Sequence, residues 1–302
     1  MNNKNCHVKR YFTIACAVII TGIFVSASGF EFKGTIKPGK WLRNLKVEYT
    51  HKGVKSSAKV QIYFPKGYEK GDNLRTIIAL HDYSGSLRNW EKETNIEKFA
   101  NMYKFIIVCP AMYKTVYETK FYPQTTYMWG KIPGGKFVGE VLINYLREEF
   151  GIAKEREMTG IVGASTGGRG AILLAATYND TFGAATGLSG DYDSVSLSRT
   201  KRFIAVYGKY KYFKKRWHDD DNIMKLAVNL KDTPVYLYHG GKERAIRKGH
   251  SVLLAIRLRQ LQKKHGGYEI TYLEKKYNTH DWDYWRRRVS EFMDFFNEKL
   301  KK

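Results

Sequence analysis

Residues 158–176 constrain the fold more than any other part of this 302-residue chain. The apolar pair Ile161 and Val162 leads into a turn of small residues at 163–167, and an apolar helical segment follows. This pattern predicts a buried strand that passes through a sharp turn directly into a helix. Such a unit is typical of a sheet that is covered by helices.

The turn at 163–167 reads Gly-Ala-Ser-Thr-Gly, which is the G-x-S-x-G pattern of a nucleophile elbow. In that turn a tight, strained backbone lifts the Ser165 hydroxyl clear of the sheet, and the flanking positions must be small. The N–H of Thr166 then faces the place where an oxyanion would form. A plain glycine-rich turn is the alternative, but the strand–turn–helix context and the additional Gly168 favour the elbow.

The rest of the chain predicts an α/β fold with a mostly parallel central sheet and helices on both faces. Two alternating segments at 45–50 and 58–64, separated by a turn at 51–53, form an antiparallel lead-in. From Thr76 onwards, nearly continuous apolar runs alternate with helical periodicity. The buried strands are expected at residues 76–80, 105–109, 158–163, 182–188, 235–239 and 268–273.

Three helices are expected between or after these strands, each with one apolar face. The first covers residues 137–150, with Val138, Val141, Leu142, Tyr145 and Leu146 on that face; the second covers 248–264, with Val252, Ile256 and Leu261; the third covers 285–300, with Trp285, Val289, Phe292, Phe296 and Leu300.

The first 27 residues have the features of a secretory signal peptide. Lys4, Lys9 and Arg10 precede an uncharged, mostly apolar stretch at 11–25, and small residues follow, so cleavage is expected after Ala27. We therefore expect an exported protein, periplasmic or secreted, with one catalytic domain at residues 28–302. An uncleaved N-terminal anchor is the alternative, although the stretch is short for a span.

Cysteine content fits this interpretation. Cys6 and Cys16 lie in the leader, so a processed chain retains Cys109 alone and has no internal disulfide. Cys109 follows an apolar run and precedes Pro110, which predicts a buried cysteine at the end of a strand.

The formal net charge is +23, and removal of residues 1–27 leaves +20. Basic residues gather at 209–217, 244–248 and 286–288. They form either a solvated basic surface or a surface for an anionic partner, such as lipid headgroups, an acidic glycan or an acidic substrate. No nucleic-acid motif is present, so we expect no nucleic-acid partner.

A serine nucleophile needs a base, and the base needs an orienting carboxylate. In the order Ser, acid, His, the base comes after the last strand, where His280 precedes the last helix. Glu243 follows the strand at 235–239 and is the expected acid, although a surface glutamate paired with Lys242 or Arg244 is the alternative.

Three consecutive aspartates, at 219–221, are rivals for the acid, but they precede the strand at 235–239. They also raise the question of a metal site. Consecutive side chains point in different directions and no spaced ligand set accompanies them, so we interpret them as a solvated acidic turn. No metal and no cofactor is expected.

The second oxyanion donor is expected in the loop that follows the strand at 76–80. The backbone N–H of Tyr83 is the candidate. His81 precedes the serine in the chain, so we expect it to support this loop and not to act as the base.

With these residues in place, the chain resembles the Putative esterase family of α/β-hydrolases, whose members include S-formylglutathione hydrolases, feruloyl and acetylxylan esterases, and mycolyltransferases. The resemblance rests on residues 78–85 with Trp90, 163–171, 188–190 and 280–285, and it covers about residues 45–300. It implies the α/β-hydrolase fold and acyl transfer through an acyl-enzyme, with Ser165 as nucleophile, His280 as base and Glu243 as acid.

Two positions depart from the family pattern. Asp82 stands where relatives usually have glycine, and its side chain could narrow the oxyanion loop or oppose the developing charge. Glu243 replaces the commoner aspartate. The expected function is an exported serine carboxylic-ester hydrolase acting on a small-molecule, glycan or lipid ester.

Two alternatives remain open. The first is an acyltransferase to a sugar or lipid hydroxyl, whose acceptor site would be lined by aromatic residues between 112 and 129: Tyr113, Tyr117, Phe121, Tyr122 and Tyr127. The second is a catalytically silent protein that binds an anionic surface, and Asp82 alone favours it.

Overall fold

The computed structural model describes residues 32, 34–123 and 132–301, and describes residues 245–248 by their backbone only. The expected signal peptide, with Cys6 and Cys16, lies outside the described residues. Residues Glu31–Lys302 belong to one structural unit.

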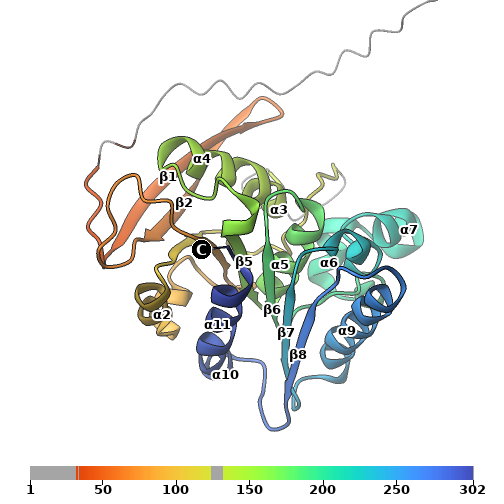
Figure 1. Ribbon diagram of the computed structural model, residues 1–302. Coiled ribbons are helices and arrows are strands. Elements are labelled where there is room, and N and C mark those ends of the chain that lie inside the picture. The colour runs from red at the N-terminus through yellow and green to blue at the C-terminus, as the bar shows by residue number, and fades with distance from the viewer. Residues whose placement is uncertain (1–31, 33, 124–131, 302) are drawn as a thin grey trace, which may run out of the picture. The chain divides into compact units, whose positions relative to one another are not determined.

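The described residues form an eight-stranded sheet with the order β1-β2-β4-β3-β5-β6-β7-β8 (Figure 1). β2 pairs antiparallel with β1 and β4, and all other neighbours are parallel. The strands are β1 (Trp41–His51), β2 (Val54–Tyr63), β3 (Thr76–Leu80), β4 (Ile106–Pro110), β5 (Thr159–Ala164), β6 (Ala184–Leu188), β7 (Val235–Gly240) and β8 (Ile270–Lys275).

Helices connect the strands from β3 onwards. The α-helices are α1 (Asn89–Glu93), α2 (Ile96–Tyr103), α3 (Gly134–Lys136), α4 (Ile143–Glu149), α5 (Thr166–Thr177), α6 (Lys201–Tyr207), α7 (Tyr210–Asp219), α8 (Ile223–Leu226), α9 (Ala245–His265), α10 (Trp282–Trp285) and α11 (Val289–Lys299). Shorter or wider turns are the π-helix η1 (Phe137–Leu142) and the 3₁₀ helices η2 (Arg156–Met158), η3 (Val195–Leu197), η4 (Ala227–Leu230) and η5 (Arg286–Arg288).

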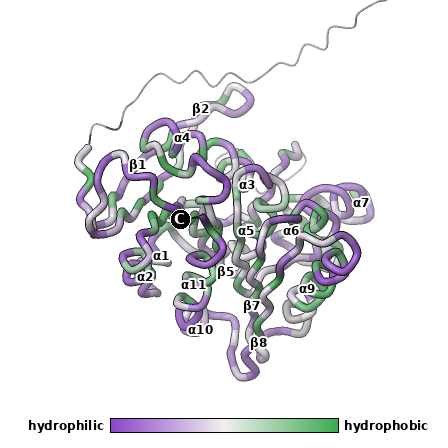
Figure 2. Tube along the Cα trace, viewed as in Figure 1, coloured by the Kyte–Doolittle hydropathy of each residue, from purple (hydrophilic) through white to green (hydrophobic). Residues whose placement is uncertain are grey.

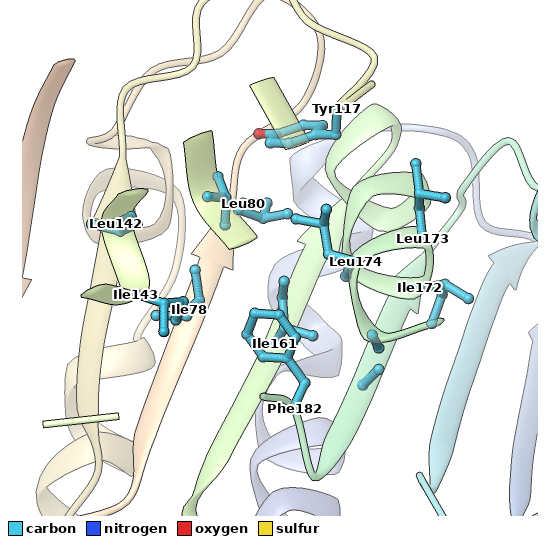
Figure 3. Packing of buried hydrophobic residues seen from close by; sticks show 14 of the residues in the cluster. Ile78, Leu80, Tyr117, Leu142, Ile143, Ile161, Ile172, Leu173, Leu174 and Phe182 are labelled. Carbon is cyan, nitrogen blue, oxygen red and sulfur yellow. The ribbon is translucent and has the colours of Figure 1, made fainter. Parts of the chain in front are cut away.

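Each face of the sheet has its own apolar core. Because successive side chains of a strand point to opposite faces, Ile78 of β3 belongs to a cluster with residues of α4, α5 and α9, whereas Ile77 belongs to a second cluster with residues of α2 and α11. Figure 3 shows Ile78 and Ile161 in the cluster that also contains Ile143 of α4 and Leu174 of α5. The helices therefore cover both faces, as expected from the continuous apolar strands.

All eight expected strands are present. β3 has the expected ends; β4, β5 and β8 are shifted by one or two residues, β6 begins two residues later, and β7 extends one residue further. The lead-in strands β1 and β2 begin four residues earlier than expected. They form a hairpin that reverses at Lys52 and Gly53, both with positive φ.

The helix predictions were confirmed in part. The five expected apolar residues of the last helix are buried. In α9 Leu261 is buried as expected, but Ile256 was wrongly placed on the buried face: it is 44% exposed, and the other buried apolar residues are Leu254, Ala255 and Leu258. Residues 252–256 are all apolar and fit several faces of a helix, and only contact with the sheet selects one. The helix expected at 137–150 also begins as a π-helix.

Cys109 is a free, buried cysteine in β4, as expected. Burial raises the pKa of its thiol. Within residues 32, 34–123 and 132–301, no helix has the length and apolar character needed to cross a bilayer.

Candidate active site

The nucleophile elbow lies between β5 and α5. Ser165 has φ 55° and ψ −118°, a strained conformation for a residue with a Cβ. Its N–H donates to the Leu188 carbonyl of β6 at 2.8 Å. A Cβ at Gly163 would lie 2.0 Å from the Gly167 carbonyl oxygen, and one at Gly167 would lie 2.5 Å from that of His81. The turn therefore needs glycine at both positions.

The structure joins the three expected triad residues by hydrogen bonds. His280 Nε2 lies 2.9 Å from Ser165 Oγ, and His280 Nδ1 lies 2.8 Å from Glu243 Oε2. These residues follow β5, β7 and β8, so the carboxyl ends of three parallel strands bring them together. Because an ionised carboxylate only accepts, Nδ1 carries the proton and Nε2 is left to accept from the serine hydroxyl.

Glu243 is fixed by more than the histidine. Its Oε1 accepts from the Gly240 N–H at 2.7 Å and from the Ser189 hydroxyl at 2.5 Å. Burial opposes ionisation of this carboxyl, but the hydrogen bonds from His280, Ser189 and Gly240 outweigh burial and lower its pKa. Glu243 is therefore a buried, ionised acid and not a surface glutamate.

Two residues of the site were not assigned a role from the sequence. Trp285 Nε1 donates to Ser189 Oγ at 3.0 Å, and the Trp285 ring meets the His280 ring edge-on, with centroids 4.9 Å apart. In the sequence Ser189 and Trp285 both belong to segments that carry the family resemblance, 188–190 and 280–285, and Trp285 is also an apolar residue of the last expected helix. The place of Ser189 directly after a buried strand is the sequence signal that could have singled it out, and in the structure it has a positive φ of 55°.

The two expected oxyanion donors lie on adjoining segments. Thr166 is the first residue of α5, so its N–H has no acceptor inside the helix. The loop after β3, which carries Tyr83, lies against the elbow, where the His81 carbonyl approaches Gly167 closely. Their amides are thus placed on two segments that meet beside Ser165.

His81 has both ring nitrogens engaged away from the serine. Its Nδ1 donates to the Asp82 carbonyl at 2.6 Å, and its Nε2 accepts from the Met112 N–H at 2.9 Å. Burial lowers its pKa, which favours the neutral ring. His81 therefore ties the loop after β3 to the loop after β4.

The Asp82 side chain lies against Gly85 of its own loop. Its Oδ1 would lie 2.4 Å from a Cβ at Gly85, the residue whose N–H bonds the Asp82 carbonyl. Asp82 Oδ1 is buried and makes no hydrogen bond within the described part of the chain.

The expectation of a solvated turn at 219–221 was wrong for Asp221. Asp221 is buried, with its Oδ2 accepting from the Tyr207 hydroxyl at 2.9 Å and from the Thr119 N–H at 3.0 Å. Its backbone carbonyl accepts from the buried Arg169 of α5 at 2.9 Å. Packing of the loop after β4 against this turn drew the carboxylate inward, which no local pattern indicates.

Beside Asp221, the buried Glu118 accepts from the Thr115 hydroxyl at 3.1 Å. Burial raises the pKa of Glu118 to about 7, and the nearby Asp221 carboxylate adds to the shift. Among the described residues, no group of three or more His, Cys, Asp or Glu side chains is arranged to hold a metal ion.

The aromatic residues expected around an acceptor site do not share one surface. Tyr117 and Tyr122 are buried, whereas Tyr113 is exposed. Tyr127 lies outside the described residues. Tyr117 instead donates from its hydroxyl to the His81 carbonyl at 2.9 Å, so it supports the loop after β3.

A family model described as "Putative esterase" matches residues 52–295, which is most of the chain. The chain belongs to this family. It is therefore a carboxylic ester hydrolase with the α/β-hydrolase fold, as the resemblance in the sequence implied.

Among curated relatives, an "Acetyl esterase" of Caldicellulosiruptor saccharolyticus is 23% identical over 240 residues, covering 75% of this chain and 85% of the relative. "Feruloyl esterase B" of Neurospora crassa is 28% identical over 123 residues, which is 38% of each protein.

Solved structures agree on the fold. The serine hydrolase FphF of Staphylococcus aureus superposes with a TM-score of 0.62 at 18% identity, covering 86% of this chain and 99% of that one. MPT51 of Mycobacterium tuberculosis superposes with a TM-score of 0.67 at 18% identity, covering 85% of this chain and 98% of that one.

Proposed function

We propose that this chain is an exported serine esterase that works through Ser165, His280 and Glu243 and forms an acyl-enzyme. The observation that carries the proposal is the continuous hydrogen-bond chain from Ser165 Oγ through His280 to Glu243. It lies at the carboxyl edge of the sheet, on an elbow whose conformation only small neighbours allow.

In the first half-reaction, His280 Nε2 takes the proton of the Ser165 hydroxyl as Oγ attacks the ester carbonyl. Glu243 stabilises the imidazolium that forms. The amides of Thr166 and Tyr83 stabilise the oxyanion. His280 then gives its proton to the leaving alcohol, and the acyl group stays on Ser165.

In the second half-reaction, water attacks the acyl-enzyme and His280 again serves as base and then as acid. The carboxylic acid leaves and Ser165 regains its proton. An alcohol in place of water would make the chain an acyltransferase, and the burial of Tyr117 and Tyr122 removes part of the acceptor surface expected for that alternative.

The relatives named for acetyl and feruloyl esters support an acetyl or feruloyl ester as the substrate. Release of p-nitrophenol from p-nitrophenyl acetate tests the reaction. Ser165→Ala should abolish turnover, whereas Ser198→Ala, which removes the same hydroxyl outside the site, should not. Unchanged turnover by folded Ser165→Ala would overturn the assignment.

We also propose that residues 1–27 direct export, on the strength of their basic start, apolar stretch and small residues before position 28. The mass of the mature N-terminus, measured on protein from the native compartment, tests this. A chain that begins at Met1 and stays in the cytosol would refute it.

A further inference from the structure

The segment after β6 has the most one-sided charge near the site. Residues 199–218, which include α6 and α7 and which we call the basic cap, contain eight Lys and Arg and no Asp or Glu. The six exposed cations are Arg199, Lys201, Lys209, Lys211, Lys214 and Lys215. Figure 2 shows α7 as largely hydrophilic.

Nearby carboxylates interact with these six cations only at longer range, as Asp219 does with Lys215. In the described part of the chain, none of the six forms an ion pair with a carboxylate. The acids that follow the cap are engaged elsewhere: Asp219 pairs with Lys225 at 2.6 Å, Asp220 pairs with Lys120, and Asp221 is buried. The outer side of the cap is therefore a concentrated positive surface.

The inner side of the cap packs beside the candidate active site. Its buried residues Phe203, Tyr207 and Trp217 form one apolar cluster, against which Tyr83 of the oxyanion loop packs. Tyr207 also accepts a hydrogen bond from Arg169 at 3.0 Å, in the helix that begins after Ser165.

Arg202 links the cap to the loops on both sides of the elbow. Its guanidinium lies 5.6 Å from the Tyr83 ring centroid, and it pairs with the buried Asp191 after β6. β3 and β6 flank β5 in the sheet, so Arg202 contacts the loops that follow both neighbours of the strand leading to Ser165.

We propose that the basic cap binds an acidic polysaccharide whose ester groups are the substrate; this rests on the proposed esterase function. A polyanion held along the exposed lysines would keep its ester substituents close to Ser165. It would also be attracted from a distance, which raises the rate of encounter at low ionic strength.

The side chains exposed on the basic cap favour a soluble polymer over a lipid surface as its partner. A helix that binds a membrane surface needs a free apolar face beside its cations. In α6 and α7 the apolar residues face the protein interior, and Tyr212 is their one exposed large apolar side chain, at 65%.

Binding can be measured without catalysis, in a Ser165→Ala background. The cap variant is Lys211→Glu, Lys214→Glu and Lys215→Glu. The control is Lys231→Glu, Lys263→Glu and Lys264→Glu, which makes the same charge change on exposed lysines near the amino ends of β7 and β8. Thermal unfolding checks that both variants fold.

The probes are polygalacturonate, an uncharged galactan of the same length, and vesicles of phosphatidylglycerol. We expect binding to polygalacturonate that the cap variant weakens by about tenfold or more and the control by about twofold or less. The binding should vanish in about 0.5 M NaCl. Equal weakening by both variants, no binding of polygalacturonate, or stronger binding of the vesicles would overturn the proposal.

Kinetics then separate docking from catalysis, with Ser165 intact. On acetylated polygalacturonate the cap variant should lose about tenfold in kcat/KM at low salt, while p-nitrophenyl acetate is turned over as by the unmodified chain. Equal kcat/KM of the cap variant and the unmodified chain on the polymer would refute the docking site even if the chain is an esterase. Absence of turnover on both substrates would refute the proposed function and leave the binding result to decide the docking site.

Discussion

Replacement of Glu243 by glutamine probes the most detailed part of the site. Glu243 Oε1 accepts two hydrogen bonds, from the Gly240 N–H at 2.7 Å and from the Ser189 hydroxyl at 2.5 Å. In Glu243→Gln the amide oxygen must stay on that side, because only an oxygen can accept both. The NH2 group then faces His280.

This orientation moves the proton of the His280 ring from Nδ1 to Nε2. Nδ1 must now accept from the amide, so His280 carries its proton on Nε2 and can no longer accept one from Ser165. The same exchange of acid for amide in a Ser-His-Asp triad lowers kcat by about 10⁴. We expect a loss of about 10³ to 10⁴ here, which corresponds to about 4 to 5.5 kcal/mol of transition-state stabilisation.

The assay is kcat on p-nitrophenyl acetate at neutral pH. Glu274→Gln is the control, since Glu274 lies 3.5 Å from a different histidine, His239, outside the site. Glu274→Gln should leave kcat close to that of the unmodified chain. A folded Glu243→Gln variant with kcat within about tenfold of the unmodified chain would refute the assigned role of this carboxylate.

Three further substitutions test the packing around the site. Gly167→Ala places a Cβ 2.5 Å from the His81 carbonyl oxygen and should cost about 2 to 4 kcal/mol in urea unfolding, with activity lost; wild-type stability would contradict the close approach. Because burial raises the pKa of Glu118 to about 7, its folded-state ionisation is disfavoured, and stability should fall as pH rises from about 4.5 to 7. Glu118→Gln should therefore raise the free energy of unfolding by up to about 3 kcal/mol at about pH 8 and leave it unchanged at about pH 4, and an equal effect at both pH values would count against this. Phe292→Ala empties a fully buried site beneath α11 and should cost about 3 to 5 kcal/mol, measured in the same way; a cost below about 1 kcal/mol would show that this core is loosely packed.

The strands could be predicted because their signal is local. Parallel strands covered on both faces are continuously apolar, so the run Thr76–Leu80 stands out from the amphipathic segments around it. The same physics explains the error in α9. Its first apolar residues are contiguous, so Ile256 and Leu254 are equally plausible as core residues until the sheet is in place.

The residues of the site likewise divide into those that local sequence signals predict and those that depend on distant contacts. Ser165, Glu243 and His280 each follow a strand, and strand ends can be read from the sequence. Ser189 and Trp285 act through contacts with partners 54 and 96 residues away in the chain, and no spacing rule reports such contacts. The inward turn of Asp221 likewise depends on a loop about a hundred residues earlier, with its Thr119 contact 102 residues away.

Covalent labelling of the nucleophile tests the central claim most directly. A fluorophosphonate probe reacts with a serine only when a base activates its hydroxyl. We expect one adduct by intact mass, mapped to Ser165 by peptide analysis, with slow labelling in His280→Ala and none in Ser165→Ala. An adduct on another residue, or equal labelling of Ser165→Ala, would contradict the assignment of Ser165 as the nucleophile.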